Sequence, residues 1–136
     1  LYSILDSFAL NGGELGGTTS AGVGGAFPDY KSVLSLTYDV GDWTLFARWT
    51  YTPELESGNG FGATLGTLTT SPAASYVDAS LRWSITDNFT LTANVNNLFD
   101  EYPPQTADGF FSQANTDPQV YRVLGRSFAV SARLRF

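Results

Sequence analysis

Five segments of the chain alternate between apolar and polar residues with a period of two. The segments are residues 30–40, 43–52, 76–85, 89–96 and 127–136. Successive side chains of a strand point to opposite faces, so this period predicts β-strands and not helices. A less regular pattern predicts a further strand over residues 1–10. The expected fold is an all-β, antiparallel up-and-down meander of about six strands, in which neighbours in sequence are neighbours in space.

The links between these segments alternate in length. Val40-Gly41-Asp42 and Thr86-Asp87-Asn88 are tight turns rich in turn-forming residues. The other links are long, over about residues 11–29, 53–75 and 98–126, and we interpret Gly12 to Gly25 as a flexible surface loop. Such long loops are uncommon in a compact soluble domain. Short turns that alternate with long loops are typical of outer-membrane barrels, so the links favour a transmembrane β-barrel.

The strand length agrees with a barrel. A strand of ~10–11 residues, rising ~3.4 Å per residue and tilted by ~45°, spans roughly 25 Å, the height of a lipid-facing band. We expect the apolar face to meet lipid, with outward side chains that include Leu45, Trp49, Leu81, Trp83, Leu91, Val95, Val130 and Leu134. Aromatic residues near the strand ends suggest interface girdles, namely Trp43, Tyr51, Tyr76, Phe89, Phe128 and Phe136.

A soluble β-sandwich is the structural alternative. Two apolar faces that meet in a dry core would produce the same alternation of residues. A sandwich accounts less well for the unequal links and for the opposite face, which is rich in Thr, Ser and Asn. These two features favour the barrel.

Composition excludes several classes of function. The 136 residues include no Cys, Met or His, and the formal net charge is −6. Without His and Cys the chain lacks the commonest metal ligands and the usual general base, and an acidic balance argues against a nucleic-acid partner. No phosphate-binding loop and no nucleophile elbow occurs. We therefore expect no enzyme, no catalytic residue, no metal site and no cofactor.

Two further absences concern the membrane and the start of the chain. No apolar run approaches the ~20 residues that a transmembrane helix needs. Residue 1 opens directly into a strand-like segment without a signal peptide. We expect the chain to begin within a longer protein.

An ordered set of motifs then resembles the C-terminal signature of TonB-dependent receptors. The set consists of Asn97-Leu98-Phe99-Asp100-Glu101-Tyr102-Pro103-Pro104, then Tyr121-Arg122-Val123-Leu124-Gly125-Arg126, and a last strand that ends in Phe136. Upstream, Pro28 before a strand, Gly41-Asp42-Trp43 at a turn and Tyr76-x-Asp78 also fit. In this family the first motif is followed by a long loop and the second leads into the final strand.

The resemblance implies the domain and its partners. Residues 1–136 would be the C-terminal segment of a barrel of about 22 strands that encloses an N-terminal plug. The parent receptor would import a scarce ligand of the siderophore, cobalamin or oligosaccharide class through the outer membrane of a Gram-negative bacterium. Its partners would be the plug and other strands, the TonB complex, the outer-membrane assembly machinery and lipid. A structural or adhesive extracellular β-protein that assembles with partner chains is the alternative function.

Candidate functional residues lie mainly on the polar face. Ligand-facing or lumen-facing candidates are Arg48, Asp78, Arg82, Asn94 and the loop aromatics Phe110 and Phe111. Phe128 and Phe136 are candidates for the signal that the assembly machinery recognises, since a strand with alternating apolar side chains suits β-augmentation. A register in which Arg48 faces Ser80 would make Asp78 its diagonal neighbour, so we expect Arg48 to contact Asp78. Asp100-Glu101 is expected to order a loop.

Overall fold

The computed structural model describes residues 2–4, 9–10, 13–14, 17–20, 25–57, 70–105, 116 and 121–136. The chain divides into two compact units. The first unit comprises Leu1–Ser32, Tyr51–Ser75 and Tyr102–Val123, and the second comprises Val33–Thr50, Tyr76–Glu101 and Leu124–Phe136. Every regular element in the described ranges is a β-strand. No helix among those residues is long and apolar enough to cross a membrane.

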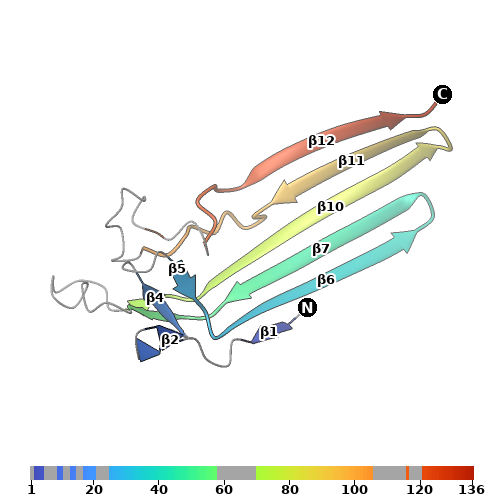
Figure 1. The fold of residues 1–136 in the computed structure, drawn as a ribbon. Coiled ribbons are helices and arrows are strands. Elements are labelled where there is room, and N and C mark those ends of the chain that lie inside the picture. Colours follow the sequence, from blue (N-terminus) through green and yellow to red (C-terminus); the bar gives the residue numbers. More distant parts are fainter. Residues whose placement is uncertain are drawn as a thin grey trace. The chain divides into compact units, whose positions relative to one another are not determined.

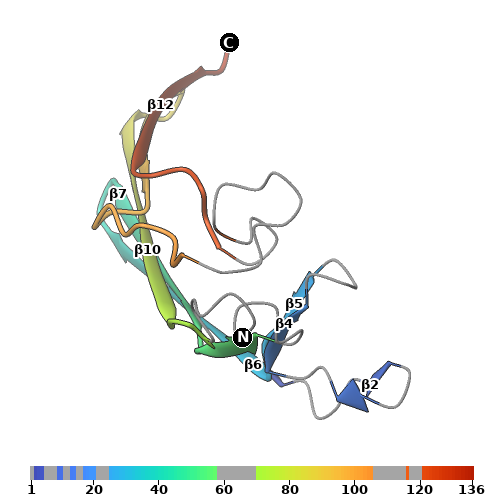
Figure 2. The same cartoon turned by 90° about the vertical axis from the view of Figure 1, so that its left-hand side faces the viewer.

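Five long strands, most of whose residues belong to the second unit, pair in one sheet. They are β6 (Tyr30–Val40), β7 (Trp43–Thr52), β10 (Ala74–Thr86), β11 (Phe89–Asn96) and β12 (Ser127–Leu134). They follow one another across the sheet in the order β6-β7-β10-β11-β12 (Figure 1), and Figure 2 shows β7, β10 and β12 in one curved layer. The five predicted strands and their meander order are confirmed, although β10 begins and β12 ends two residues earlier than expected.

The two short turns are also confirmed, and they lie at the same end of the sheet (Figure 1). In the turn between β6 and β7, Gly41 has a φ of +55°, whereas Asp42 has no positive φ. This combination suits a type II′ hairpin, which favours glycine at its first central position. In the turn between β10 and β11, the Thr86 hydroxyl accepts a hydrogen bond of 3.0 Å from the backbone N–H of Phe89.

The pairing of the last three strands separates an apolar face from a polar face. On β11, Leu91 lies opposite Trp83 of β10 and Ala132 of β12. Its neighbour Thr92 lies opposite polar residues on both sides. The large apolar side chains are exposed, and they include Leu34, Leu36, Tyr38, Leu45, Leu81, Val130 and Leu134. This exposure fits a surface that meets lipid and disagrees with the dry core of a soluble sandwich.

The first unit differs from expectation. The described residues of 1–10 belong to two sheets: β1 (Tyr2–Ile4) pairs with the first residues of β6, and β2 (Ala9–Leu10) pairs with β3 (Gly13–Glu14) in a separate sheet. The expected sixth strand is therefore confirmed at Tyr2–Ile4, which completes a six-stranded sheet next to β6, whereas Ala9–Leu10 belongs to another sheet. Pairings of two or three residues are too short to show a period.

The two long links before β6 and before β10 also contain short strands. The strands β4 (Thr18–Ser20), β5 (Gly25–Phe27), β8 (Leu55–Ser57) and β9 (Thr70–Ser71) form a small sheet in which β4 and β8 run parallel. The described residues within the expected loop from Gly12 to Gly25 are thus partly strand, at Gly13–Glu14 and Thr18–Ser20. Gly17 has a φ of +72°, and its backbone N–H donates to the carbonyl oxygen of Phe27 at 2.7 Å.

Aromatic residues near the strand ends behave in two ways. Trp43 and Trp83 stack with their ring centroids 4.7 Å apart and their planes 7° apart, and Tyr30 stacks on Tyr51 at 6.2 Å. These pairs are suited to an interface girdle. Tyr76 was wrongly assigned to that girdle, because it is 2% exposed and lies on the polar face of β10.

Candidate functional site

The polar face of the second unit carries a buried acid with a basic partner. Nη2 of Arg48 on β7 donates to Oδ2 of Asp78 on β10 at 2.8 Å, and Nε of Arg48 donates to the same oxygen at 3.2 Å. The Asp78 side chain is 7% exposed and the Arg48 side chain is 45% exposed. The predicted contact between the two residues is confirmed. An ionised carboxylate with so little access to water needs this compensation.

The second oxygen of Asp78 joins the ion pair to the end of β11. Oδ1 of Asp78 accepts a hydrogen bond of 3.1 Å from the backbone N–H of Asn97. The next backbone N–H, that of Leu98, donates to the carbonyl oxygen of Val77 at 2.7 Å. Asp78 therefore connects β7, β10 and the residues that follow β11.

Asn97 and Asp100 close a turn at this point. Both have positive φ, of 53° and 58°, which are left-handed conformations that Asn and Asp tolerate better than most residues. The Asn97 side chain, in a residue that is 1% exposed, donates through Nδ2 to the carbonyl oxygen of Glu101 at 2.9 Å and accepts from the Glu101 backbone N–H at 2.9 Å. The backbone N–H of Asp100 donates to the carbonyl oxygen of Asn97 at 2.9 Å. The motif thus ends β11 in a turn in which the Asn97 side chain is hydrogen-bonded to the backbone of Glu101.

Asp100 carries the connection onward to β12. Its Oδ1 accepts a hydrogen bond of 2.7 Å from the backbone N–H of Arg126, and Nη1 of Arg126 donates to the carbonyl oxygen of Leu98 at 3.3 Å. A Cβ atom at Gly125 would lie 2.9 Å from the same Asp100 oxygen. The guanidinium of Arg126 also lies 5.9 Å from the centre of the Phe128 ring. We call Asp78, Asn97, Asp100, Gly125 and Arg126 the strand junction.

The strand junction was only partly foreseen. The expectation that Asp100-Glu101 orders a loop is confirmed for Asp100, which holds the approach to β12. The roles of Asn97, Gly125 and Arg126 were missed. The spacing of Asn and Asp in Asn97-Leu98-Phe99-Asp100 was the available signal, because these residue types favour left-handed turns.

The expected register between β7 and β10 needs a correction. Three of the contacts between these neighbouring strands define their register: the Ser84 N–H to Asp42 carbonyl bond, the Trp43–Trp83 stack and the Arg48–Asp78 ion pair. The residue numbers in each pair have the same sum, as they must in a single antiparallel register. Arg48 therefore lies opposite Asp78 and not opposite Ser80, which is a shift of two residues from the expected pairing.

The remaining candidates are spread over the sheet. Asn94 lies opposite Ser80 and Ala129, and Arg82 lies opposite Thr92, so both share the polar face with Arg48 and Asp78. Phe128 and Phe136 are exposed. Phe110 and Phe111 lie outside the described residues. The structure joins Arg48 and Asp78 in an ion pair and places Asn94 and Arg82 at later positions along the same face.

Chemically, the arrangement is a structural junction on a polar wall. No group of three or more acidic, His or Cys side chains within the described ranges could hold a metal ion. The polar atoms of Asp78, Asn97 and Asp100 named above are engaged with the protein itself. What the wall offers to another molecule lies elsewhere on the polar face.

Comparison with known proteins identifies the fold. The family described as TonB dependent receptor-like, beta-barrel matches residues 2–98. The chain belongs to this family. Its localisation follows, because these receptors lie in the outer membrane of Gram-negative bacteria, and the antiparallel sheet with one exposed apolar face is consistent with part of a transmembrane barrel. The matched segment ends at Leu98, so the Tyr121–Arg126 motif and β12 lie beyond it.

Solved structures extend the likeness to more of the chain. The ferric-catecholate import receptor Fiu from E. coli K12 shares 22% sequence identity with a TM-score of 0.60, over 81% of this chain and 16% of the receptor. The copper transporter OprC shares 21% identity with a TM-score of 0.52, over 82% of this chain and 18% of the transporter. The receptor segment therefore spans less than a fifth of the length of these two proteins. No curated protein matches the chain at a significant level.

Proposed function

We propose that this receptor segment is the C-terminal part of an active importer that carries a scarce ligand across the outer membrane. The segment supplies barrel wall and external loops, and the energy comes from the inner membrane through TonB. The ligand belongs to the siderophore, cobalamin or oligosaccharide class. Metal-carrying ligands are the first to test, because Fiu is a ferric-catecholate import receptor and OprC is a copper transporter.

One observation carries the proposal: a family match over residues 2–98 coincides with a sheet that has one exposed apolar face and one polar face. A wall of this kind separates lipid from an aqueous lumen. An adhesive protein would also need an exposed surface, but nothing in the geometry favours that alternative over the barrel.

The incomplete sheet supports partners within the same receptor. In the described sheet, β12 is an edge strand with β11 as its only neighbour. An open edge is not tolerated in lipid, because the unpaired backbone groups have no water to bind. Five or six strands also enclose too little space for a plug, since barrel diameter grows with the number of strands. We therefore propose further barrel strands, a plug and the TonB complex as partners, with the assembly machinery and lipid as the surroundings.

The candidate residues divide by role. Arg48 and Asp78 bind each other, so their contribution to import is the integrity of the wall. Arg82 and Asn94 remain candidates for contact with the lumen contents. Phe110 and Phe111 remain candidates for contact with ligand from outside, and Phe128 and Phe136 for recognition during assembly.

The test is uptake by the full-length receptor in its own bacterium. Cells with and without the receptor are given radiolabelled iron as a catecholate complex, radiolabelled copper, labelled cobalamin and a labelled oligosaccharide mixture. Each measurement is repeated in a strain without TonB. We expect one class to accumulate in a manner that requires both the receptor and TonB.

One control and one contrary outcome complete the uptake test. Purification of the receptor in detergent should yield one polypeptide that carries a plug upstream of this segment. Uptake that is the same with and without the receptor for all four classes, or that is independent of TonB, would contradict active import.

A further inference from the structure

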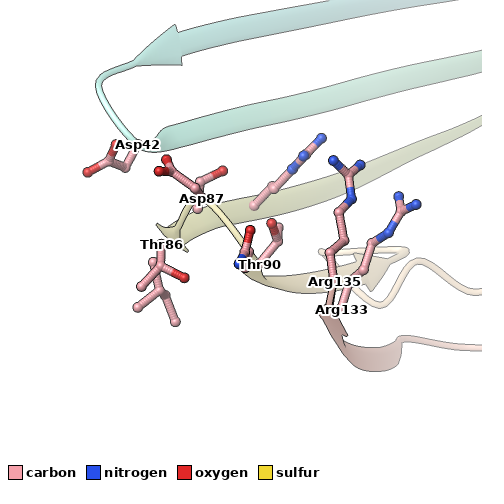
Figure 3. Close-up of a pocket in the computed structure, with 10 residues that line it drawn as sticks. Asp42, Thr86, Asp87, Thr90, Arg133 and Arg135 are labelled. Atoms are coloured by element: carbon pink, nitrogen blue, oxygen red, sulfur yellow. The ribbon is translucent and has the colours of Figure 1, made fainter.

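Three of the seven basic residues of this acidic chain line a single pocket. Arg82 of β10, and Arg133 and Arg135 at the end of β12, face a cavity of about 400 Å³ beside the two tight turns. In Figure 3 the side chains of Arg133 and Arg135 project to the same side of the sheet, while Asp42 and Asp87 come from the turns. We call these three arginines the arginine pocket.

The strand register explains why the arginines gather. Arg133 lies opposite Thr90, and Arg82 lies opposite Thr92 on the other side of β11. Side chains two residues apart on a strand share a face, so Arg82 and Arg133 are on the polar face. Beyond the end of β12, the backbone N–H of Arg135 still donates to the carbonyl oxygen of Asn88 at 2.9 Å, which continues the pairing and keeps Arg135 on that face.

The charges of the pocket are not balanced. Three guanidinium groups face two carboxylates, those of Asp42 and Asp87. Within the described residues, no ion pair joins any of the three arginines to an acidic group. Neighbouring like charges destabilise a sheet, whereas Arg48, further along the same face, has its carboxylate at 2.8 Å. The excess positive charge calls for an anionic group that the described residues do not supply.

The position of the pocket indicates from which face of the sheet an anion can reach the arginines. Arginine forks bind carboxylate and phosphate equally well in geometry. The apolar face, with Trp83 and Leu134, lies on the other side of the sheet, so a lipid headgroup would approach from the wrong face. An occupant of the lumen approaches from the polar face. A cavity of about 400 Å³ accommodates one or two acidic side chains.

We propose that the arginine pocket binds Asp or Glu side chains of the domain seated in the barrel lumen, and so fastens that domain at the tight-turn end of the wall. This inference rests on the proposed function, because it requires a receptor whose lumen is filled. It assigns Arg82, Arg133 and Arg135 a docking role that is separate from the strand junction.

The first experiment locates the occupant in the full-length receptor. A photo-reactive amino acid replaces Arg135, the cells are irradiated, and the cross-linked peptide is identified by mass spectrometry. A link to an acidic peptide of the same polypeptide, upstream of this segment, supports the proposal. A link to lipid, a link to another protein or the absence of an internal link overturns it.

The second experiment tests the charge. In purified full-length receptor, R133E/R135E should accelerate limited proteolysis of the lumen domain about tenfold at low salt, on the scale of one or two lost ion pairs. The difference should shrink at about 1 M NaCl, where the Debye length is about 3 Å. R133K/R135K, which keeps the charge, and K31E, a reversal of charge on another strand, should change the rate less than about twofold.

Several outcomes distinguish docking of the lumen domain from a soluble-anion site and from a failure of the proposed import. Heat-modifiable migration on gels shows whether each variant has a folded barrel. If R133E/R135E does not fold, the proteolysis rate of R135Q and the cross-linking result test the docking instead. Equal proteolysis of R133E/R135E and wild type overturns docking, as does protection by millimolar inorganic phosphate without an internal cross-link, which indicates a soluble-anion site. Normal uptake without the cross-link overturns this inference alone, whereas the cross-link without uptake overturns import alone.

Discussion

The ion pair of Asp78 gives the sharpest test of the wall. In D78A, Arg48 loses the oxygen that accepts two of its N–H groups, and the backbone N–H of Asn97 loses its acceptor. A buried N–H left without a partner costs about 1–3 kcal/mol, and a hydrogen bond to a charged group contributes about 1.5–3 kcal/mol. Arg48 is 45% exposed, so water replaces part of its lost bonds.

These contributions set the loss of stability that we expect in D78A. We expect D78A to lower the free energy of unfolding by about 2–4 kcal/mol. D78N keeps an acceptor for Asn97 but removes the charge, so its loss should be about half as large. D39A is the matched control: Asp39 is a carboxylate on the same polar face that accepts from the Thr44 hydroxyl at 2.6 Å, and it is exposed. Its loss should stay below about 1 kcal/mol.

The assay is urea unfolding of the full-length receptor refolded into lipid vesicles, followed by tryptophan fluorescence and by heat-modifiable migration. The comparison uses midpoints at a constant slope, because a changed slope signals a change in the unfolded or folded state rather than in stability alone. The double variant R48A/D78A should be less destabilised than the sum of its single variants predicts. Equal losses for D78A and D39A would show that the ion pair does not stabilise the wall, and the reasoning from burial would be wrong.

Three further predictions use the same receptor. L91R should lower the unfolding free energy by about 2–4 kcal/mol if residue 91 lies near the middle of the bilayer, whereas T37R on the polar face should have a much smaller effect; equal effects in vesicle unfolding would contradict the assignment of faces. G125A should cost about 1–3 kcal/mol, because its Cβ would lie 2.9 Å from Oδ1 of Asp100, and D100A should remove part of that cost in the double variant; strict additivity would exclude the clash. F136A should reduce the folded, heat-modifiable receptor in the outer membrane without reducing its synthesis, while F136Y should assemble; normal assembly of F136A would leave Phe136 as an interface aromatic only.

The faces of the sheet were predictable, whereas the pairing between distant strands was not. A period of two determines which side chains share a face, so Arg48 and Asp78 were correctly placed together. A shift of two residues preserves both faces, and nothing in residues 53–75 sets the register, so Ser80 was wrongly placed opposite Arg48. The turn between β10 and β11 fixes only the pairing of Thr86 with Phe89, because an irregularity between Ser84 and Thr86 shifts the rest of that pairing by one residue, which the turn does not predict.

The strand junction and the short strands could not be predicted from the sequence, for different reasons. The junction depends on contacts between Asp78, Asp100 and Arg126, which are far apart in the chain and whose pairing no local pattern encodes. The short strands of the first unit, such as β2 and β9, have two residues each, fewer than one full alternation. Tyr76 was misjudged because an aromatic residue at a strand end was taken as an interface residue, although its parity with Asp78 already placed it on the polar face.

The turn at Asn97 and Asp100 has a consequence for how the receptor can change over time. The Asn97 side chain makes two hydrogen bonds with the backbone of Glu101, and Asp100 accepts a hydrogen bond from the backbone of Arg126. Both ends of the link from Glu101 to Arg126 are therefore held by contacts with the barrel wall. Lengthening a link whose ends are already held adds little entropic cost, about 0.6 kcal/mol for each doubling. The link between Glu101 and the Gly125-Arg126 approach can therefore change in length at little cost while β12 keeps its place.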